Sequence, residues 1–272
     1  MSKIFKRVTV FLLLLVLCSN VTLSNAAFAN KHETIIDGHK SNFVILNNDL
    51  QNFEYTYDEN GKSFKVFEIT DATLKHVDSK IFQKNENGNY ELFLTLVTEI
   101  EDGIATLTTT DQDGTVSTES TDLNPFIESI EKGSDIVLDF NDSPKLNTPL
   151  FSTASTSLTN WKYSAELKGS NAFVKYTVLG IVATIGVLVA GALGGALAPA
   201  VTAGLTSIAS AIIADNLDIV YYKQYVYYKY IIDTNLPRAE WTSTQFYESS
   251  QRTQAQKIGD TISHEYYVPG WS

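Results

Sequence analysis

The feature that most constrains this chain is a run of 39 consecutive residues, 176–214, without a charged side chain. Fifteen of them are Val, Ile or Leu, ten are Ala and six are Gly. A single helix of that length would measure about 60 Å, roughly twice the hydrocarbon thickness of a bilayer. A glycine pair at 194–195 and Pro199 interrupt the run, because both residue types are unfavourable inside a helix. The run therefore predicts a helical hairpin with arms near 177–193 and 199–214.

Both arms are apolar enough to enter a bilayer, since each central Val, Ile or Leu favours insertion by roughly 0.3 to 0.6 kcal/mol. Gly, Ser and Thr offset part of this gain, so the hairpin can also be kept in water under a protein cover. This composition predicts a hairpin that inserts into a membrane only under certain conditions. The alternative is a buried hairpin packed on the sheet of its own domain. The side chains expected to enter lipid are Val178, Leu179, Ile181, Val182, Ile185, Val187, Leu188, Val189, Leu193, Leu197, Val201, Leu205, Ile208 and Ile212.

Small residues recur four positions apart along the hairpin, a spacing that lets two helices approach closely in lipid. The residues expected to pack helix against helix are Gly186, Ala190, Gly191, Gly194 and Gly195. The tip between 191 and 200 contains no ionisable group, so it can enter a membrane from outside without carrying charge across.

Aromatic residues gather around the hairpin, because eleven of the 14 Tyr and all three Trp lie beyond residue 160. Trp and Tyr favour the headgroup zone of a membrane. Tyr is equally a good strand former, so ordinary strands are an equal alternative. The residues expected at the interface are Trp161, Tyr176, Tyr221, Tyr222 and Trp241.

The N-terminus has the three parts of an export signal. Basic residues precede the apolar run 8–17, and Ala-Phe-Ala at 27–29 places small residues where a signal peptidase cleaves. Residues 1–29 are therefore predicted to be a signal peptide, and the protein is expected to be secreted and able to associate with membranes. A lipid anchor at Cys18 is the alternative, but Leu17 stands where lipoprotein processing needs a small residue. Cys18 is the only cysteine, so no intramolecular disulfide can form.

Charge divides the remaining chain into two parts. Residues 30–150 hold 23 acidic and 9 basic side chains, whereas 151–272 hold 8 of each. Prolines and a run of Ser and Thr lie at the junction, so 146–160 is predicted to be a linker and cleavage region. We expect an acidic leader or pro domain over 30–145 and an effector domain over 161–272.

The acidic part alternates apolar and polar residues in short runs, which predicts an antiparallel β-meander over about 43–104. Asn-Gly sequences within such runs are strong hairpin signals. Turns are expected at 58–61, 85–89 and 111–114, and a short helix near 124–131.

Beyond the linker, alternation predicts strands at 161–169 and 219–232, the latter rich in Tyr, and two more strands within 241–271. The fold class expected is α+β. An acidic antiparallel β-meander domain is followed by a domain in which a Gly/Ala-rich apolar helical hairpin is flanked by Tyr-rich β-strands.

Several chemistries find no support in the sequence. The chain is acidic, with a net charge of -11, and lacks the basic patch that nucleic acid binding requires. Asp111 and Asp113 resemble part of a calcium loop, but Thr109 and Ser120 occupy its first and last ligand positions. No motif of a serine hydrolase, zinc protease or phosphate loop occurs. We expect no enzyme, no cofactor, no metal and no nucleic acid partner.

Trp161, Tyr163 and the Gly169-Ser170 pair precede the Gly/Ala hairpin, a Tyr-rich strand and a polar tail. With the export signal, acidic leader and junction before them, most of the chain resembles the large heat-labile bacteriocins of the geobacillin type from Gram-positive bacteria. The resemblance implies an antibacterial protein, released by processing, whose C-terminal part acts on related bacteria. The chain lacks the double-glycine leader and paired cysteines of small bacteriocins, which leaves the processing site open.

The residues and the resemblance lead to one hypothesis. The acidic propeptide covers the hairpin 176–214 during export, and cleavage frees an antimicrobial fragment that permeabilises target membranes. The partners expected are bacterial membrane lipid, a processing protease and an immunity protein. The alternative is a non-toxic secreted or envelope-anchored protein that uses the hairpin as anchor or core.

Overall fold

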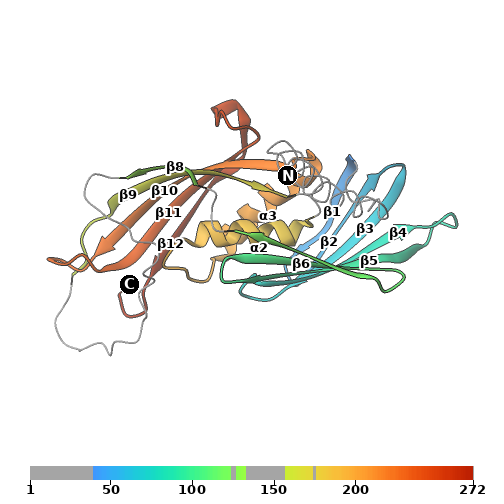
Figure 1. Cartoon of the computed structure of the whole chain (residues 1–272), viewed down its shortest axis with the longest axis horizontal. Helices are drawn as coiled ribbons and strands as arrows, with labels where there is room; N and C mark the ends of the chain where they lie inside the picture. The colour runs from blue at the N-terminus through green and yellow to red at the C-terminus, as the bar shows by residue number, and fades with distance from the viewer. Residues whose placement is uncertain (1–38, 124–126, 133–156, 174–175, 272) are drawn as a thin grey trace, which may run out of the picture. The chain divides into compact units, whose positions relative to one another are not determined.

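Two antiparallel sheets and two helices make up the computed structural model of the chain (Figure 1). The residues that it describes are 39–123, 127–132, 157–173 and 176–271. Gly38–Ser272 form one compact unit. The expected mixture of helices and antiparallel sheets is confirmed. The predicted signal peptide, 1–29, lies outside the described residues.

The first sheet is a seven-stranded meander in which each strand pairs with the next one in sequence. Its strands are β1 (Lys40–Asp49), β2 (Asn52–Glu59), β3 (Lys62–Thr70), β4 (His76–Lys84), β5 (Tyr90–Glu101), β6 (Ile104–Asp111) and β7 (Val116–Asp122). The three predicted turns connect β2 to β3, β4 to β5 and β6 to β7, so those predictions are confirmed. Asn60 and Gly61 both have positive φ, 51° and 74°, which matches the twist of a two-residue hairpin.

The second sheet has five strands in the order β12-β11-β10-β9-β8. The strands are β8 (Ile127–Lys132), β9 (Lys162–Ala172), β10 (Ile219–Tyr230), β11 (Pro237–Tyr247) and β12 (Lys257–Tyr267). A short 3-10 helix, η2 (Gln254–Gln256), precedes β12. The two strands predicted around the hairpin and the two in the tail are confirmed.

The helix predicted near 124–131 is wrong, because residues 127–132 form strand β8, which pairs with β9. The free edge of β9 offers backbone partners, and pairing there outweighs the local pattern. The chain therefore passes from one sheet to the other between Asp122 and Ile127, before the predicted linker. Most of that linker, residues 146–156, lies outside the described part of the chain.

The apolar run forms α2 (Val178–Ala190) and α3 (Pro199–Ala214), so the predicted hairpin is confirmed. The first helix ends at Ala190, three residues earlier than predicted, and is followed by Gly191, whose φ is 74°. α2 contacts β3, β4 and β5 of the first sheet and β11 and β12 of the second, and α3 contacts β12 and β1. Within the described residues, neither helix combines the length and apolar character needed to cross a bilayer.

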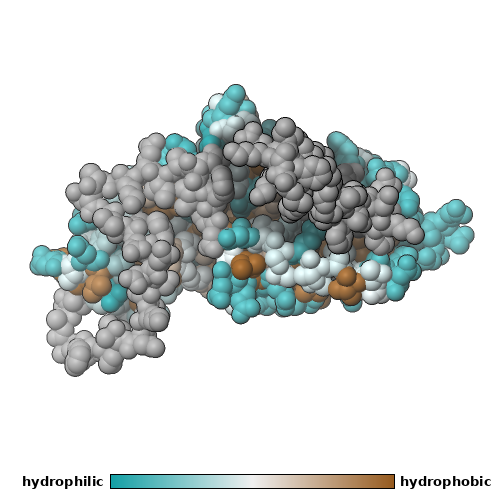
Figure 2. Space-filling model, in the orientation of Figure 1, coloured by the Kyte–Doolittle hydropathy of each residue, from teal (hydrophilic) through white to brown (hydrophobic). Residues whose placement is uncertain are grey.

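The visible face in Figure 2 is mostly hydrophilic or intermediate where described residues form it, and hydrophobic residues are scattered over it. The exposed large hydrophobic side chains include Val116 of β7, Ile69 of β3 and Leu236 after β10, which belong to different elements. Single apolar residues of this kind are normal on protein surfaces.

Candidate functional site

Helix α2 is enclosed by the protein on nearly all sides. Ten of its 13 residues are buried, and no charged residue lies in its first or last turn. Its sequence is apolar around the whole circumference, as a helix inside a core requires. The Thr184 hydroxyl donates to the Gly180 carbonyl at 2.8 Å, so this polar group is satisfied within the helix.

The N-terminus of α2 is bound by a carboxylate from the first sheet. Glu68 of β3 is fully buried, and each of its two carboxylate oxygens lies 3.2 Å from the Leu179 amide nitrogen. The Ser79 hydroxyl donates to Glu68 at 3.0 Å and lies 3.1 Å from the Thr177 hydroxyl. Thr177 itself provides no side-chain cap. Glu68 therefore takes the place of a capping residue, and the positive end of the helix dipole favours its negative charge.

Burial raises the pKa of Glu68 to about 7, from an ordinary value of 4.5, although its hydrogen bonds act in the opposite direction. The Tyr55 hydroxyl, 3.4 Å from the Val178 amide nitrogen, accepts its hydrogen bond. Burial, and secondarily the charge of Glu68, raise the pKa of Tyr55. Among the described residues, no cation forms an ion pair with Glu68. Its charge is thus balanced by hydrogen bonds alone, which makes the ionised form costly.

A second buried glutamate holds the chain directly after α2. Glu240 of β11 accepts hydrogen bonds from the amides of Ala192, at 3.1 Å, and Leu193, at 2.7 Å. Burial raises the pKa of Glu240, and bonds from these amides and from the Tyr228 hydroxyl act against that rise. We call Glu68 and Glu240 the glutamate clamp, because the two side chains accept hydrogen bonds from backbone amides at opposite ends of α2.

The last carbonyls of α2 also have partners in the second sheet. Gln224 of β10 donates to the Leu188 carbonyl at 2.8 Å, and Thr242 of β11 donates to the Val189 carbonyl at 2.7 Å. Carbonyls in the last turn of a helix have no partner inside the helix, so side chains of the sheet satisfy them instead. Both ends of α2 therefore depend on polar groups from outside the hairpin.

Helix α3 is buried on one face only. Leu205, Ile208 and Ile212 are at most 2% exposed. The threonine hydroxyls of α3 bond to their own helix, because Thr202 donates to the Ala198 carbonyl at 3.2 Å and Thr206 to the Thr202 carbonyl at 2.9 Å. These hydroxyls need no partner outside the helix.

The uncharged tip between the helices reaches the surface. Ala192, Ala196 and Ala198 are exposed, while the glutamate clamp holds the other side of this segment. Burial lowers the pKa of His264 on β12, and its hydrogen bond to the backbone of Gly194 acts in the opposite direction. An uncharged surface segment thus joins one enclosed helix and one half-covered helix.

The structure buries most side chains that were expected to enter lipid. Val187 is 36% exposed, and the remaining four are partly buried. The nine buried ones are Val178, Leu179, Ile181, Val182, Ile185, Val189, Leu205, Ile208 and Ile212. In this state the hairpin is a core element that contacts both sheets.

The predicted helix-packing ridge needs correction. Gly191, Gly194 and Gly195 lie beyond the end of α2, and all three have positive φ. A Cβ on Gly191 would overlap the Glu240 carboxylate, and one on Gly195 would overlap the Tyr266 ring. These glycines are required by backbone conformation and by the second sheet, so they form no helix-on-helix ridge.

Gly186 and Ala190 do lie on α2. A Cβ on Gly186 would lie 3.2 Å from Leu197 and 3.9 Å from Leu205 of α3. The absence of a side chain at Gly186 therefore lets Leu197 and Leu205 approach α2 closely.

Of the five residues predicted at a membrane interface, the structure brings two together. The rings of Trp161 and Trp241 are 6.2 Å apart. Tyr222 is 1% exposed and belongs to the core, so its interfacial assignment is wrong for this state, because its position in β10 faces inward. Tyr176 packs near Phe173.

Tyr221 lies away from the tryptophan pair, beneath the Arg252 guanidinium at 5.5 Å. Around that pair the rings of Tyr227 and Trp241 stack at 4.6 Å, and Lys229 lies 4.6 Å from the Trp161 ring. The cluster is thus an aromatic group in which Tyr227 and Trp241 stack, Trp161 is tilted against Trp241, and Lys229 lies against Trp161.

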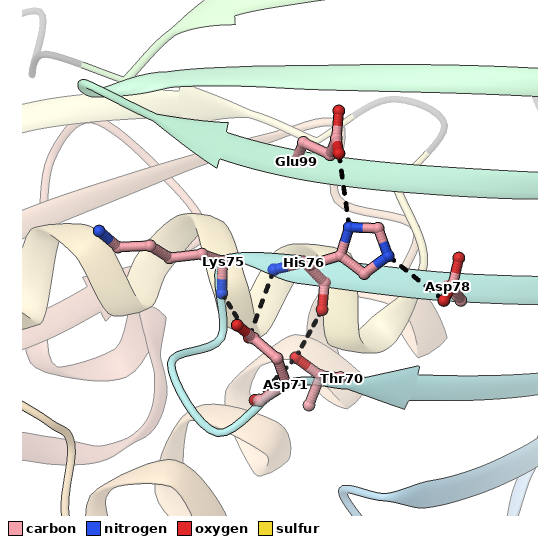
Figure 3. Close-up of polar contacts among 6 residues, drawn as sticks. All are labelled: Thr70, Asp71, Lys75, His76, Asp78 and Glu99. Carbon is pink, nitrogen blue, oxygen red and sulfur yellow. Dashed lines mark hydrogen bonds and ion pairs between the residues drawn. The ribbon is translucent and has the colours of Figure 1, made fainter.

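A cavity of about 960 Å³ lies between the hairpin and the loops of the first sheet. The loop between β3 and β4 forms part of its wall and is held by Asp71, which accepts hydrogen bonds from the amides of Lys75, at 2.9 Å, and His76, at 3.4 Å (Figure 3). Thr70 donates to the His76 carbonyl at 3.0 Å in the same loop. Leu74 has a φ of 58°, a conformation that is strained for a bulky residue.

The sequence prediction missed the glutamate clamp. Glu68 occupies an inward position of β3, in phase with the buried Phe64 and Val66. A carboxylate in phase with apolar residues on an alternating strand is a usable signal for a buried acid. Glu240 gives no such signal, since it neighbours the equally buried Ala239.

Within the described part of the chain, no group of three or more His, Cys, Asp or Glu side chains could hold a metal ion. At Asp111 the structure has a turn, in which Asp111 accepts hydrogen bonds from the amides of Asp113 and Thr115. No family model matches the chain, and no curated protein or solved structure matches it.

Proposed function

We propose that this is a secreted, bacteriocin-like antibacterial protein whose hairpin 176–214 inserts into target membranes and permeabilises them. The fold described above is then the stored form of the hairpin. One observation carries the proposal: an uncharged hairpin has its first arm held at both ends by side chains of the surrounding sheets, while its uncharged tip lies at the surface. An apolar element held from outside can be released when the holding groups are removed.

The acidic part of the chain, 30–145, acts as the cover in this proposal. It supplies Glu68, Tyr55 and Ser79, which together contact the N-terminus of α2. Cleavage within 146–160 by a protease would cut the covalent link between these residues and the Tyr-rich part that contains the hairpin, and β8 would then have to leave β9 for the two parts to separate. The surrounding contacts support the idea that processing frees α2 at its N-terminal end first.

A second function has its own support. The near-complete burial of α2 is what an ordinary core helix requires, so the protein can instead be a non-toxic secreted or envelope protein. In that case the hairpin stabilises the fold and leaves membranes intact.

Dye release from liposomes separates the two functions. The secreted protein, before and after limited proteolysis of the 146–160 segment, is added to anionic liposomes that contain a self-quenched dye. Val187→Asp is the diagnostic variant, because Val187 is 36% exposed in the stored form yet lies within an arm that must enter lipid. A charge at such a position costs roughly 2.5 to 3.5 kcal/mol in a bilayer. Val116→Asp is the matched control, since Val116 is 60% exposed on β7, outside the hairpin.

The proposal expects dye release by the processed protein, its loss in Val187→Asp and its retention in Val116→Asp. Absence of release at micromolar protein would contradict permeabilisation. Equal release by both variants would show that another part of the chain acts on the membrane.

A further inference from the structure

The cavity beside the hairpin has the dimensions and lining of a ligand site. Its volume of about 960 Å³ lies within the range of roughly 300 to 1,000 Å³ typical of such pockets. One wall is the α2 face made of Ala183, Gly186, Val187 and Ala190, which follow helical spacing. This face extends for about 10 Å along the helix axis. Val187 and Ala190 are the more exposed residues of this face, whereas Ala183 and Gly186 are buried at its back.

The opposite helical wall is also effectively apolar. It consists of Pro199, Thr202, Ala203 and Thr206 of α3. Both threonine hydroxyls donate to carbonyls of their own helix, so they do not require a partner in the cavity. The exposure of Val187, on a helix otherwise buried, shows that apolar surface faces this open space.

Among the lining residues that the structure describes, the polar rim offers one cation, Lys75. Asp71 and Asp49 line the cavity, but both carboxylates accept hydrogen bonds from backbone amides of their own loops. Lys75 also lines it, is exposed, and its ammonium makes no hydrogen bond or ion pair with any residue that the structure describes. Figure 3 shows the Lys75 side chain extending away from Asp71. A space walled by apolar helix faces, with this cation at its rim, fits an alkyl chain that ends in an acid.

We infer that this cavity binds a long-chain fatty acid, with the alkyl chain along the small residues of α2 and α3 and the carboxylate at Lys75. The site lies in the folded protein, so the inference goes beyond membrane permeabilisation and does not depend on it. Burial of an alkyl chain supplies the affinity, and Lys75 selects the acidic head group.

The test is displacement of a fluorescent fatty acid from the full-length secreted protein by oleic acid and, separately, by oleyl alcohol. Ala203→Phe fills the cavity from an exposed position of α3, and Ala200→Phe is its matched control, because Ala200 is exposed on the same helix but outside the cavity lining. Lys75→Met removes the cation. Near-ultraviolet circular dichroism checks that each variant is folded, and Val187→Phe is the second filling variant if Ala203→Phe is unfolded.

One fatty acid is expected to bind per chain. The filling variant should lose at least tenfold in affinity, and Ala200→Phe should lose none. Lys75→Met should weaken oleic acid about tenfold and leave oleyl alcohol unchanged. The inference is overturned if the wild-type protein does not bind oleic acid, or if filling the cavity leaves affinity unchanged. Equal loss for acid and alcohol in Lys75→Met would overturn the assignment of the head group.

Discussion

Replacement of Glu68 by Gln tests how the first sheet holds the helix. Glu68 is fully buried at the N-terminus of α2 and receives hydrogen bonds from Leu179 and Ser79. Glutamine keeps the size and one acceptor oxygen of this side chain, but it cannot ionise. Any pH dependence that Glu68 contributes to stability must therefore disappear in Glu68→Gln.

The sign and size follow from the raised pKa. The pKa of Glu68 is about 7 in the folded protein and 4.5 as an ordinary side chain, so the folded state binds more protons between these values. The free energy of unfolding consequently falls as the pH rises through this range, and the contribution of Glu68 is complete below the lower value. The difference between the two pKa values, 4.5 and about 7, corresponds to about 3 kcal/mol of unfolding free energy. Above pH 7 the ionised carboxylate stays buried, and the stability does not fall further on its account.

Urea denaturation followed by tryptophan fluorescence, at several pH values from 4.5 to 8, measures this effect. Between these limits the wild-type protein should lose about 3 kcal/mol of unfolding free energy relative to Glu68→Gln. Glu86→Gln is the matched control, because Glu86 is exposed in the turn between β4 and β5, and it should follow the wild type. If wild type and Glu68→Gln change in parallel with pH, the argument from burial is refuted.

Three further substitutions test the other end of α2. Glu240→Ala leaves the amides of Ala192 and Leu193 without their hydrogen-bond acceptor. Both amide hydrogens should therefore exchange faster with solvent, and the free energy of unfolding should fall by about 2 kcal/mol. Unchanged exchange rates would show that Glu240 is not needed to hold this segment. Gly191→Ala and Gly194→Ala both place a Cβ at positive φ, 74° and 72°, but only the first overlaps Glu240. In thermal denaturation Gly191→Ala should therefore be the less stable by at least about 1 kcal/mol, and equal stabilities would speak against the close contact.

Local patterns in the sequence predicted the parts of the fold that depend on neighbouring residues. The turn at Asn60 and Gly61 and the start of α3 at Pro199 were predictable, because each follows from backbone preferences within a few residues. The first helix was predicted too long, since Leu193 continues the apolar pattern. It ends just before Gly191, where Glu240 comes too close for any side chain.

Contacts between distant residues were not predictable from one sequence. Strand β8 was expected to be helical, and only its pairing with β9 decides its conformation. The bond from Leu179 to Glu68 joins positions 111 residues apart. This hydrogen bond depends on how the first sheet packs on α2, and the periodicity of apolar residues in the sequence gives no information on that packing. The site was therefore predicted as a hairpin, but the groups that hold it were not.

Under the proposed function, these holding groups, rather than hydrophobicity, decide whether the hairpin can leave the protein. Ile181 and Val182 are 0% exposed in the core, so folding has already removed both side chains from water. Their transfer to lipid therefore adds no further hydrophobic gain. The polar contacts of the hairpin, in contrast, are lost on transfer because lipid offers no equivalent partners. The carbonyls of Leu188 and Val189 lose Gln224 and Thr242 on release, and an unsatisfied backbone group in hydrocarbon costs about several kcal/mol. Since each helix end carries such contacts, the barrier to insertion lies at the ends of α2. The pH response of Glu68 reports the strength of the N-terminal contact, because protonation changes the bonds there without altering an apolar side chain of the hairpin.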